Sequence, residues 1–235
     1  MISQASFEYP SISDYVNPSF KLLSSDEYLL ALNGTGLPLS ILHRTYNRWL
    51  PTLTDPLIPA GIGFALQCFC LPSPRAFALL FCERREPYAP AVRLRFYTIS
   101  CSCDNLTLRK TLALPIARSP LLTIAVYEPE LNQFYVFYAN RSIYEVHVDS
   151  GRGCTTMIGQ LAERADYVML HDNTLYTVSM DMFRKRLNLY AFDARQRVPR
   201  AQSAAIEVME GERWPNMHSY RNLLLACYAR CIDTG

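Results

Sequence analysis

One hydrophobic pattern recurs along this 235-residue chain: a strand-like run, a short polar turn, and a second, more apolar run. The turns recur about every 40 to 57 residues, and helical periodicity is nearly absent. Repetition at this period is typical of chains built from stacked structural units. The pattern therefore predicts five β-hairpins, whose two runs are 20–23 with 28–32, 64–68 with 77–81, 122–126 with 134–138, 167–170 with 174–178, and 216–219 with 223–227.

A third run follows the three middle hairpins in close register. Tyr97, Tyr144 and Tyr190 occupy the same place in it and lie 47 and 46 residues apart. A fourth, weaker run spans 106–114, 154–159 and 204–208 in these copies. The first copy is degenerate over 41–49, which lacks apolar alternation. Four antiparallel strands per unit at this period predict an all-β fold: a β-propeller-like array of about five four-stranded blades, with the last blade incomplete.

The array is predicted to cover 18–235 as one domain, because all-β chains of this length commonly form a single unit. Segment 1–17 precedes the array and is a candidate closing strand. A two-sheet β-sandwich explains the strands locally but not their spacing, and an α+β fold is the remaining alternative. Because few residues follow the fifth hairpin, we expect its apolar edge to stay open. The protein is then expected to self-associate, to need a partner strand, or to be part of a longer propeller.

The repeats resemble kelch-type and other β-propeller repeats over roughly 18–235. Segment 134–137 resembles the second strand of a kelch repeat, and Tyr144 and Tyr190 resemble the tyrosine of its third strand. No copy has the double glycine that ends the kelch second strand, and only Trp49 is a candidate for the kelch tryptophan. The WD dipeptide of another propeller family is absent as well. The resemblance therefore implies an architecture and no particular family.

Composition narrows the classes of function. A net charge of +2 gives no general attraction to nucleic acid or membranes. The N-terminus lacks the apolar stretch of a secretory signal, so we expect a cytoplasmic protein, and prolines and glycines interrupt the longest uncharged segment, 56–74. The eight cysteines are expected to be reduced and mostly buried. The pairs Cys68/Cys70 and Cys101/Cys103 lack the wider spacing of a structural zinc site.

Motifs of known catalytic chemistry are absent, and we expect no cofactor and no metal. Segment 33–36 has the composition of a hairpin turn and lacks the third glycine of a dinucleotide-binding loop. Segment 147–154 resembles the Asp-box of sialidase-like propellers only at Asp149 and Gly151. We therefore expect Asp149 to be a turn residue that hydrogen-bonds its own backbone. A carbohydrate-active propeller hydrolase is the alternative function, and it would need a pair of carboxylates at a set separation.

Arginine and aromatic residues gather at the turns that follow the second and fourth strands, and in the expected array these turns leave the same face. The candidate partner-binding residues on that face are Arg84, Arg85, Tyr88, Phe183, Arg184, Arg186, Arg213 and Trp214. Arginine with tyrosine or tryptophan is the composition that dominates protein-binding hot spots. The sequence therefore predicts a non-enzymatic scaffold that binds other proteins. The alternative interpretation is a set of solvated loop charges, with Trp214 packed against the core.

A second basic group, Arg195, Arg197 and Arg200, falls between the third and fourth strands of its blade. The turns there emerge on the opposite face from Arg184 and Arg186. Binding to phosphates needs several positive charges along one track. The distribution of arginines therefore argues against nucleic acid as a partner.

Overall fold

The structure, a computed structural model, describes residues 21–24, 28–32, 39–43, 48–49, 63–73, 75–85, 88–100, 106–115, 122–149, 155–181, 183–184, 186–199 and 204–207. Within these ranges the chain forms strands and turns and no α-helix. That part of the chain accordingly holds no helix long and apolar enough to span a bilayer.

The strands pair antiparallel with their neighbours along the chain and form four sheets. The first sheet contains β1 (Lys21–Ser24), β2 (Tyr28–Leu32), β3 (Leu39–His43) and β4 (Arg48–Trp49). The second contains β5 (Gly63–Cys70), β6 (Ala76–Arg85), β7 (Tyr88–Ile99) and β8 (Leu106–Ala113). The third contains β9 (Ile124–Glu128), β10 (Gln133–Phe137), β11 (Ser142–His147) and β12 (Thr155–Gln160). The fourth contains β13 (Tyr167–His171), β14 (Thr174–Asp181), β15 (Arg186–Asp193), β16 (Val198–Pro199) and β17 (Ala204–Glu207), and both β16 and β17 pair with β15.

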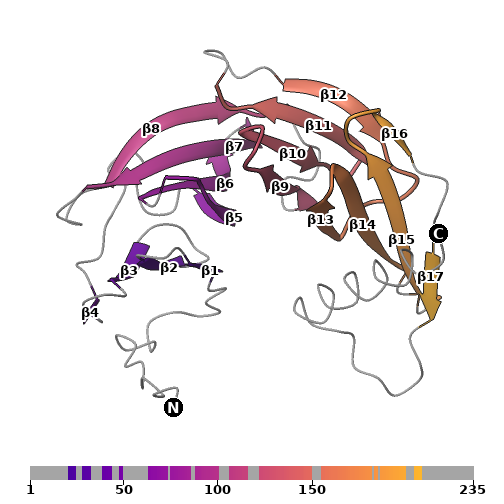
Figure 1. Cartoon of the computed structure of the whole chain (residues 1–235), viewed down its shortest axis with the longest axis horizontal. Coiled ribbons are helices and arrows are strands. Elements are labelled where there is room, and N and C mark those ends of the chain that lie inside the picture. Colours follow the sequence, from indigo (N-terminus) through magenta and orange to yellow (C-terminus); the bar gives the residue numbers. More distant parts are fainter. Residues whose placement is uncertain are drawn as a thin grey trace.

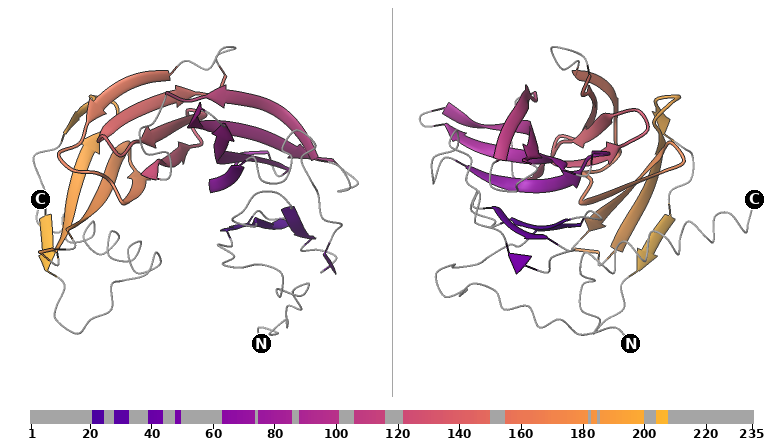
Figure 2. Two further views of the ribbon diagram at one scale, coloured as in Figure 1. Left: turned by 180° about the vertical axis from the view of Figure 1, so that it is seen from behind. Right: turned by 60° about the vertical axis from the view of Figure 1, so that its left-hand side comes forward.

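The four sheets succeed one another around an arc, as Figure 1 shows, and both views of Figure 2 keep the same succession. The first strand of each sheet lies on the inner side of the arc, while β8 and β12 lie on the outer side. Consecutive sheets meet through these first strands, because β5 contacts both β1 and β9, and β9 also contacts β13. The second and the third sheet therefore each have a neighbouring sheet on both faces.

The four-stranded units predicted from the sequence are confirmed for the first four copies, and the three aligned tyrosines lie in β7, β11 and β15. The first copy is less degenerate than expected, because β3 and β4 pair as its third and fourth strands. The short strand β16 was not expected from the sequence. The fifth copy, 216–227, and segment 1–17 lie outside the described residues. The open edge of a last blade therefore stays a prediction.

Strand β10 is buried along its whole length and supplies the core on both sides of the third sheet. Phe134 and Val136 point toward the second sheet, whereas Tyr135 and Phe137 point toward the fourth, because alternate side chains of a strand face opposite ways. We call the two resulting contacts the second–third interface and the third–fourth interface. A continuous apolar run in a strand is what burial on both faces requires.

The second–third interface is filled by aliphatic and aromatic side chains. Phe134 is fully buried in it, and its ring lies 5.1 Å from Phe69, 5.9 Å from Phe96 and 4.7 Å from Tyr127 between centroids. A buried polar contact also joins the sheets, because the backbone N–H of Ala125 donates to Oε1 of Gln67 at 2.6 Å. Among the cysteines whose side chains are described, Cys82 is buried as expected, whereas Cys68 and Cys70 are only half-buried, and burial raises the pKa of the Cys70 thiol.

The third–fourth interface is apolar only in its middle. Phe137, Ile143, Leu175 and Phe192 are buried there in one cluster. Gly159 of β12 permits the close approach of Phe192, because a Cβ atom at this position would lie 2.7 Å from the ring. Both ends of this interface carry polar residues, and the candidate sites lie there.

Candidate functional site

The predicted arginine and aromatic residues fall into two separate groups. Arg84, Arg85 and Tyr88 belong to the second sheet, and they lie in β6 and β7 rather than in a loop. The reason is that the long β6–β7 ladder continues through an irregularity after Glu83 until Arg85 pairs with Tyr88. Phe183, Arg184 and Arg186 belong to the fourth sheet, with the third sheet between the two groups. Arg213 and Trp214 lie outside the described residues.

The β14–β15 turn holds Phe183 and Arg184 in a fixed backbone geometry. The Oδ1 atom of Asp181 accepts hydrogen bonds from the backbone N–H groups of Phe183 at 3.1 Å and Arg184 at 3.0 Å. The Arg184 guanidinium lies 3.7 Å from the other carboxylate oxygen. Arg186, also expected in the turn, is the first residue of β15 and pairs with Asp181 in the ladder. The side chain of Phe183 is fully exposed, at 101%.

Polar residues from the loop between β12 and β13 stand at the same end of the interface. The Nη1 atom of Arg141 donates to the backbone oxygen of Ala162 at 2.9 Å. The Nδ2 atom of Asn188 donates to Glu163 at 3.0 Å. Burial raises the pKa of Tyr190, and the carboxylate of Glu163 adds to that rise. The turn that carries Phe183 is therefore bordered by a hydrogen-bonded polar surface.

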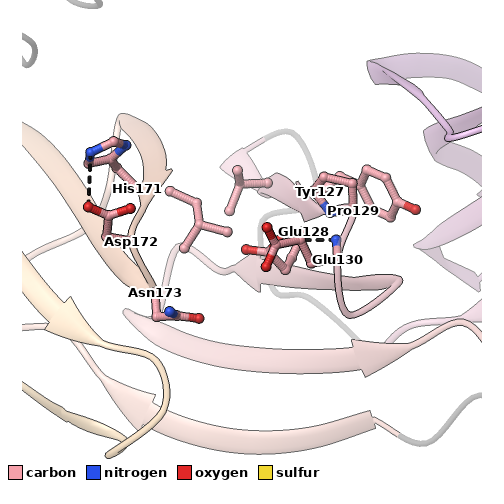
Figure 3. A pocket seen from close by; sticks show the side chains of 9 residues that line it. Tyr127, Glu128, Pro129, Glu130, His171, Asp172 and Asn173 are labelled. Atoms are coloured by element: carbon pink, nitrogen blue, oxygen red, sulfur yellow. Dashed lines mark hydrogen bonds and ion pairs between the residues drawn. The ribbon is translucent and has the colours of Figure 1, made fainter.

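The opposite end of the same interface contains a cavity of about 280 Å³ (Figure 3). It lies between the β9–β10 turn of the third sheet and the β13–β14 turn of the fourth. Its lining residues are Val126, Tyr127, Glu128, Pro129, Glu130, Leu170, His171, Asp172 and Asn173. The sequence predicted both turns but not that they lie together around one cavity. The only sequence feature that points to the cavity is the presence of carboxylates at corresponding turns of successive copies.

The two turns around the cavity have defined conformations. Asp172 and Asn173 form a two-residue hairpin connection with φ of 46° and 60°. Positive φ at both positions is typical of a type I′ turn, and aspartate and asparagine tolerate it better than most residues. His171 Nε2 lies 3.3 Å from Oδ2 of Asp172. In the other turn, the backbone N–H of Glu130 donates to Oε1 of Glu128 at 3.3 Å (Figure 3).

A polar network joins the third and fourth sheets at this end. Arg197, in the turn after β15, donates to Oε2 of Glu145 in β11 at 3.0 Å. His147 lies 3.5 Å from the same carboxylate. The buried amide of Gln133 donates to the hydroxyl of Tyr135 at 2.6 Å. Burial, followed by the nearby Glu145 carboxylate, raises the pKa of Tyr135 to about 12.

Asp149 has a side-chain partner that the sequence did not suggest, and its predicted hydrogen bond to its own backbone stays a prediction. The Nδ2 atom of Asn132 donates to Oδ1 of Asp149 at 2.8 Å, while the backbone oxygen of Asn132 accepts from Val148 N–H at 3.2 Å. Asn132 has a φ of 46°, in the left-handed region that asparagine tolerates better than most residues. This carboxylate therefore links two turns of the third sheet. The rest of the Asp-box-like segment, 150–154, lies outside the described residues.

The arginines occupy the two ends of the fourth sheet as expected. Arg186 begins β15, whereas Arg195 and Arg197 follow its last residue, Asp193. The two basic groups are therefore separated by the length of that strand, and Arg200 lies outside the described residues. Within the described ranges, no three His, Cys, Asp or Glu side chains are grouped in a way that could hold a metal ion.

Comparison with known proteins identifies a fold and no family. No protein-family model matches the sequence, and no curated protein matches it. Hydrazine synthase from Kuenenia stuttgartiensis superposes with a TM-score of 0.50 at 10% identity, covering 77% of this chain and 46% of that one. A functionally unknown protein from Desulfotomaculum acetoxidans superposes with a TM-score of 0.52 at 12% identity, covering 81% of this chain and 56% of that one. This chain thus spans about half the length of each.

A putative 6-phosphogluconolactonase from Bacteroides fragilis gives a lower TM-score of 0.43 at 9% identity, covering 79% of this chain and 70% of that one. Identities this low carry information about the fold alone. The arrangement of successive antiparallel sheets is shared with the two structures that superpose with TM-scores of 0.50 and 0.52.

Proposed function

We propose that this protein is a β-propeller-like scaffold that binds another protein through the turn between β14 and β15. In a propeller, successive four-stranded sheets stand around an axis with their first strands innermost. The contacts of β5 with β1 and β9, and of β9 with β13, support this architecture. The superpositions with TM-scores of 0.50 and 0.52 support it as well.

The full exposure of Phe183 is the observation that carries the proposed binding role. A phenylalanine side chain gains about 1.5–3 kcal/mol when it is removed from water, so an exposed one at a turn tip is a ready contact for a partner. The neighbouring Arg184 is also exposed, and arginine and aromatic residues are enriched in protein interfaces. Asp181 fixes the backbone of both residues, so little conformational entropy would be lost on binding.

A hydrolase is less well supported by the carboxylates around the cavity. A glycosidase acid needs a carboxyl group whose surroundings keep it protonated near neutral pH. Glu130 and Asp172 are exposed, and Glu128 is half-buried. Solvent contact of this kind favours binding over acid catalysis.

The proposal is tested by comparing the Phe183→Ala variant with the wild type in affinity capture from native cells. Met157→Ala is the matched control, because Met157 is another exposed apolar residue, 52% accessible, in β12. We expect a partner to be depleted about ten- to hundredfold by Phe183→Ala, which corresponds to the loss of one buried phenylalanine. The control should retain it. Purified partner should show the same loss in a titration, with the thermal unfolding of both variants unchanged. Equal capture of all proteins by the three chains would refute the proposed site.

A further inference from the structure

The cavity between the β9–β10 and β13–β14 turns lies at the opposite end of β14 from Phe183, so the proposed partner contact makes no use of it. We propose that it is a separate binding site for a cationic group on a short aliphatic stem, either a primary ammonium or a guanidinium. The inference goes beyond the proposed scaffold function and does not depend on it. Size, floor and charge of the cavity each contribute to the argument.

The size of the cavity selects a small occupant. Its volume of about 280 Å³ falls just below the range of roughly 300–1,000 Å³ that pockets for drug-sized ligands occupy. One amino-acid side chain or a small organic cation is an occupant of the right scale. The cavity opens between two sheets, so a side chain could enter it from outside without unfolding either turn.

The floor of the cavity contains two apolar side chains, within a lining that is otherwise mostly polar. Val126 and Leu170 project from the neighbouring inner strands β9 and β13, and both pack against the buried cluster of the third–fourth interface. A methylene stem would bury area against this floor, at a gain of about 0.8 kcal/mol for each fully buried CH₂ group.

The rim carries negative charge on two sides. Glu128 and Glu130 come from one turn and Asp172 from the other, and the lining contains no lysine or arginine. The potentials of carboxylates on opposite walls of a crevice add, because the low-dielectric walls focus the field into the opening. A cation bound between them would gain charge-assisted hydrogen bonds, which are about twice as strong as neutral ones.

The walls are held in place before any ligand binds. Arg197 and Glu145 link the third and fourth sheets, and Asn132 and Asp149 link the turns within the third. The rim carboxylates are therefore displayed on anchored hairpins. A preorganised site of this kind loses little entropy on binding.

The test is a titration of the full chain with matched probes, followed by nuclear magnetic resonance. Nα-acetyl-arginine amide is compared with Nα-acetyl-citrulline amide, which has nearly the same shape but no charge. Butylguanidine is the third probe, because it carries the guanidinium on a bare aliphatic stem and has the same single charge as the arginine probe. We expect the arginine probe to bind at least about tenfold more tightly than citrulline, since a charged hydrogen bond contributes more than the factor of ten requires. Shifts should centre on residues 126–130 and 170–173.

The variant Glu128→Gln/Asp172→Asn should weaken the arginine probe at least about tenfold. Glu163→Gln is the matched control, because it removes a carboxylate from the opposite end of the same interface and keeps an oxygen that can accept from Asn188. Equal binding of arginine and citrulline by the wild type would overturn the inference, and so would unchanged binding by the double variant.

The two guanidinium probes also distinguish the source of the ligand. Preference for butylguanidine would identify a small free cation, and preference for the blocked arginine would identify a side chain of a protein or peptide. Phe183→Ala should bind both probes like the wild type. Failure of this site and failure of the proposed partner turn would therefore be seen in different measurements.

Discussion

The two faces of the third sheet differ in how their interfaces are completed. Toward the second sheet, Phe134 and its aromatic neighbours continue the apolar packing. Toward the fourth sheet, buried Gln133, Thr177 and Ser179 flank the apolar middle, and a cavity opens at one end. Apolar packing needs only matched volume, whereas polar groups need specific partners. One side of this sheet is therefore built mainly for stability, and the other leaves room for recognition.

The largest effect is expected when one central side chain of each interface is truncated, which tests whether the two interfaces differ in their contribution to stability. Phe134→Ala should lower the free energy of unfolding by about 4 kcal/mol, because a fully buried ring with three aromatic neighbours leaves a large cavity. Phe137→Ala, in the third–fourth interface, should cost about 1 kcal/mol less. Urea unfolding measures both values. Were Phe137 the costlier truncation, the second–third interface would not be the main source of stability.

An intermediate effect is expected when the third–fourth interface is overfilled. Gly159→Ala places a methyl group 2.7 Å from the buried ring of Phe192 and should cost about 2 kcal/mol. Phe192→Leu in the same chain should recover part of that loss, because the smaller side chain makes room for the methyl group. The thermal unfolding midpoints of the single and double variants test this. Additive losses would show that the ring and the methyl group do not compete for space.

The smallest effect is expected in alkaline solution and concerns Tyr135. Its pKa is raised to about 12 in the folded protein, while an unfolded tyrosine ionises near 10. The unfolded state therefore binds fewer protons between these values, and stability is lost as pH rises from about 10 to about 12. The loss should be on the order of 1 kcal/mol, because solvent screening reduces the full effect of the shift. Tyr135→Phe should remove this part of the pH dependence in thermal unfolding, and a profile identical to the wild type would contradict the assignment.

The strand pairing could be predicted because it depends on short-range patterns. The recurring hairpin pattern identified 134–138 as an apolar strand, and the spacing of Tyr97, Tyr144 and Tyr190 aligned three successive units. The length of the β6–β7 ladder could not be predicted, because Pro87 indicates a turn but not how far the strands on either side of it stay paired. Pairing in this ladder places Arg84, Arg85 and Tyr88 in strands, whereas the sequence predicted a turn for them.

The candidate sites were less predictable than the strands. Phe183 and Arg184 were identified because the position of their turn follows from the strands on either side. The cavity was not predicted, because Glu128 and Asp172 are far apart in the sequence. Only the spacing of the two sheets brings them to the same cavity. That distance is set by the volumes of buried side chains such as Phe192 and Leu175, and no local pattern encodes it.

The pairing of strands with their neighbours along the chain has a consequence for synthesis. Each sheet can complete its hydrogen bonds as soon as its own segment has left the ribosome, since such local contacts form quickly. The second sheet would then display Leu80, Leu94 and Phe96 to solvent until the third sheet arrives to cover them. A nascent chain that pauses before the third sheet is made therefore exposes an apolar surface that is prone to aggregation. The rate of translation across this boundary then affects how well the protein avoids aggregation.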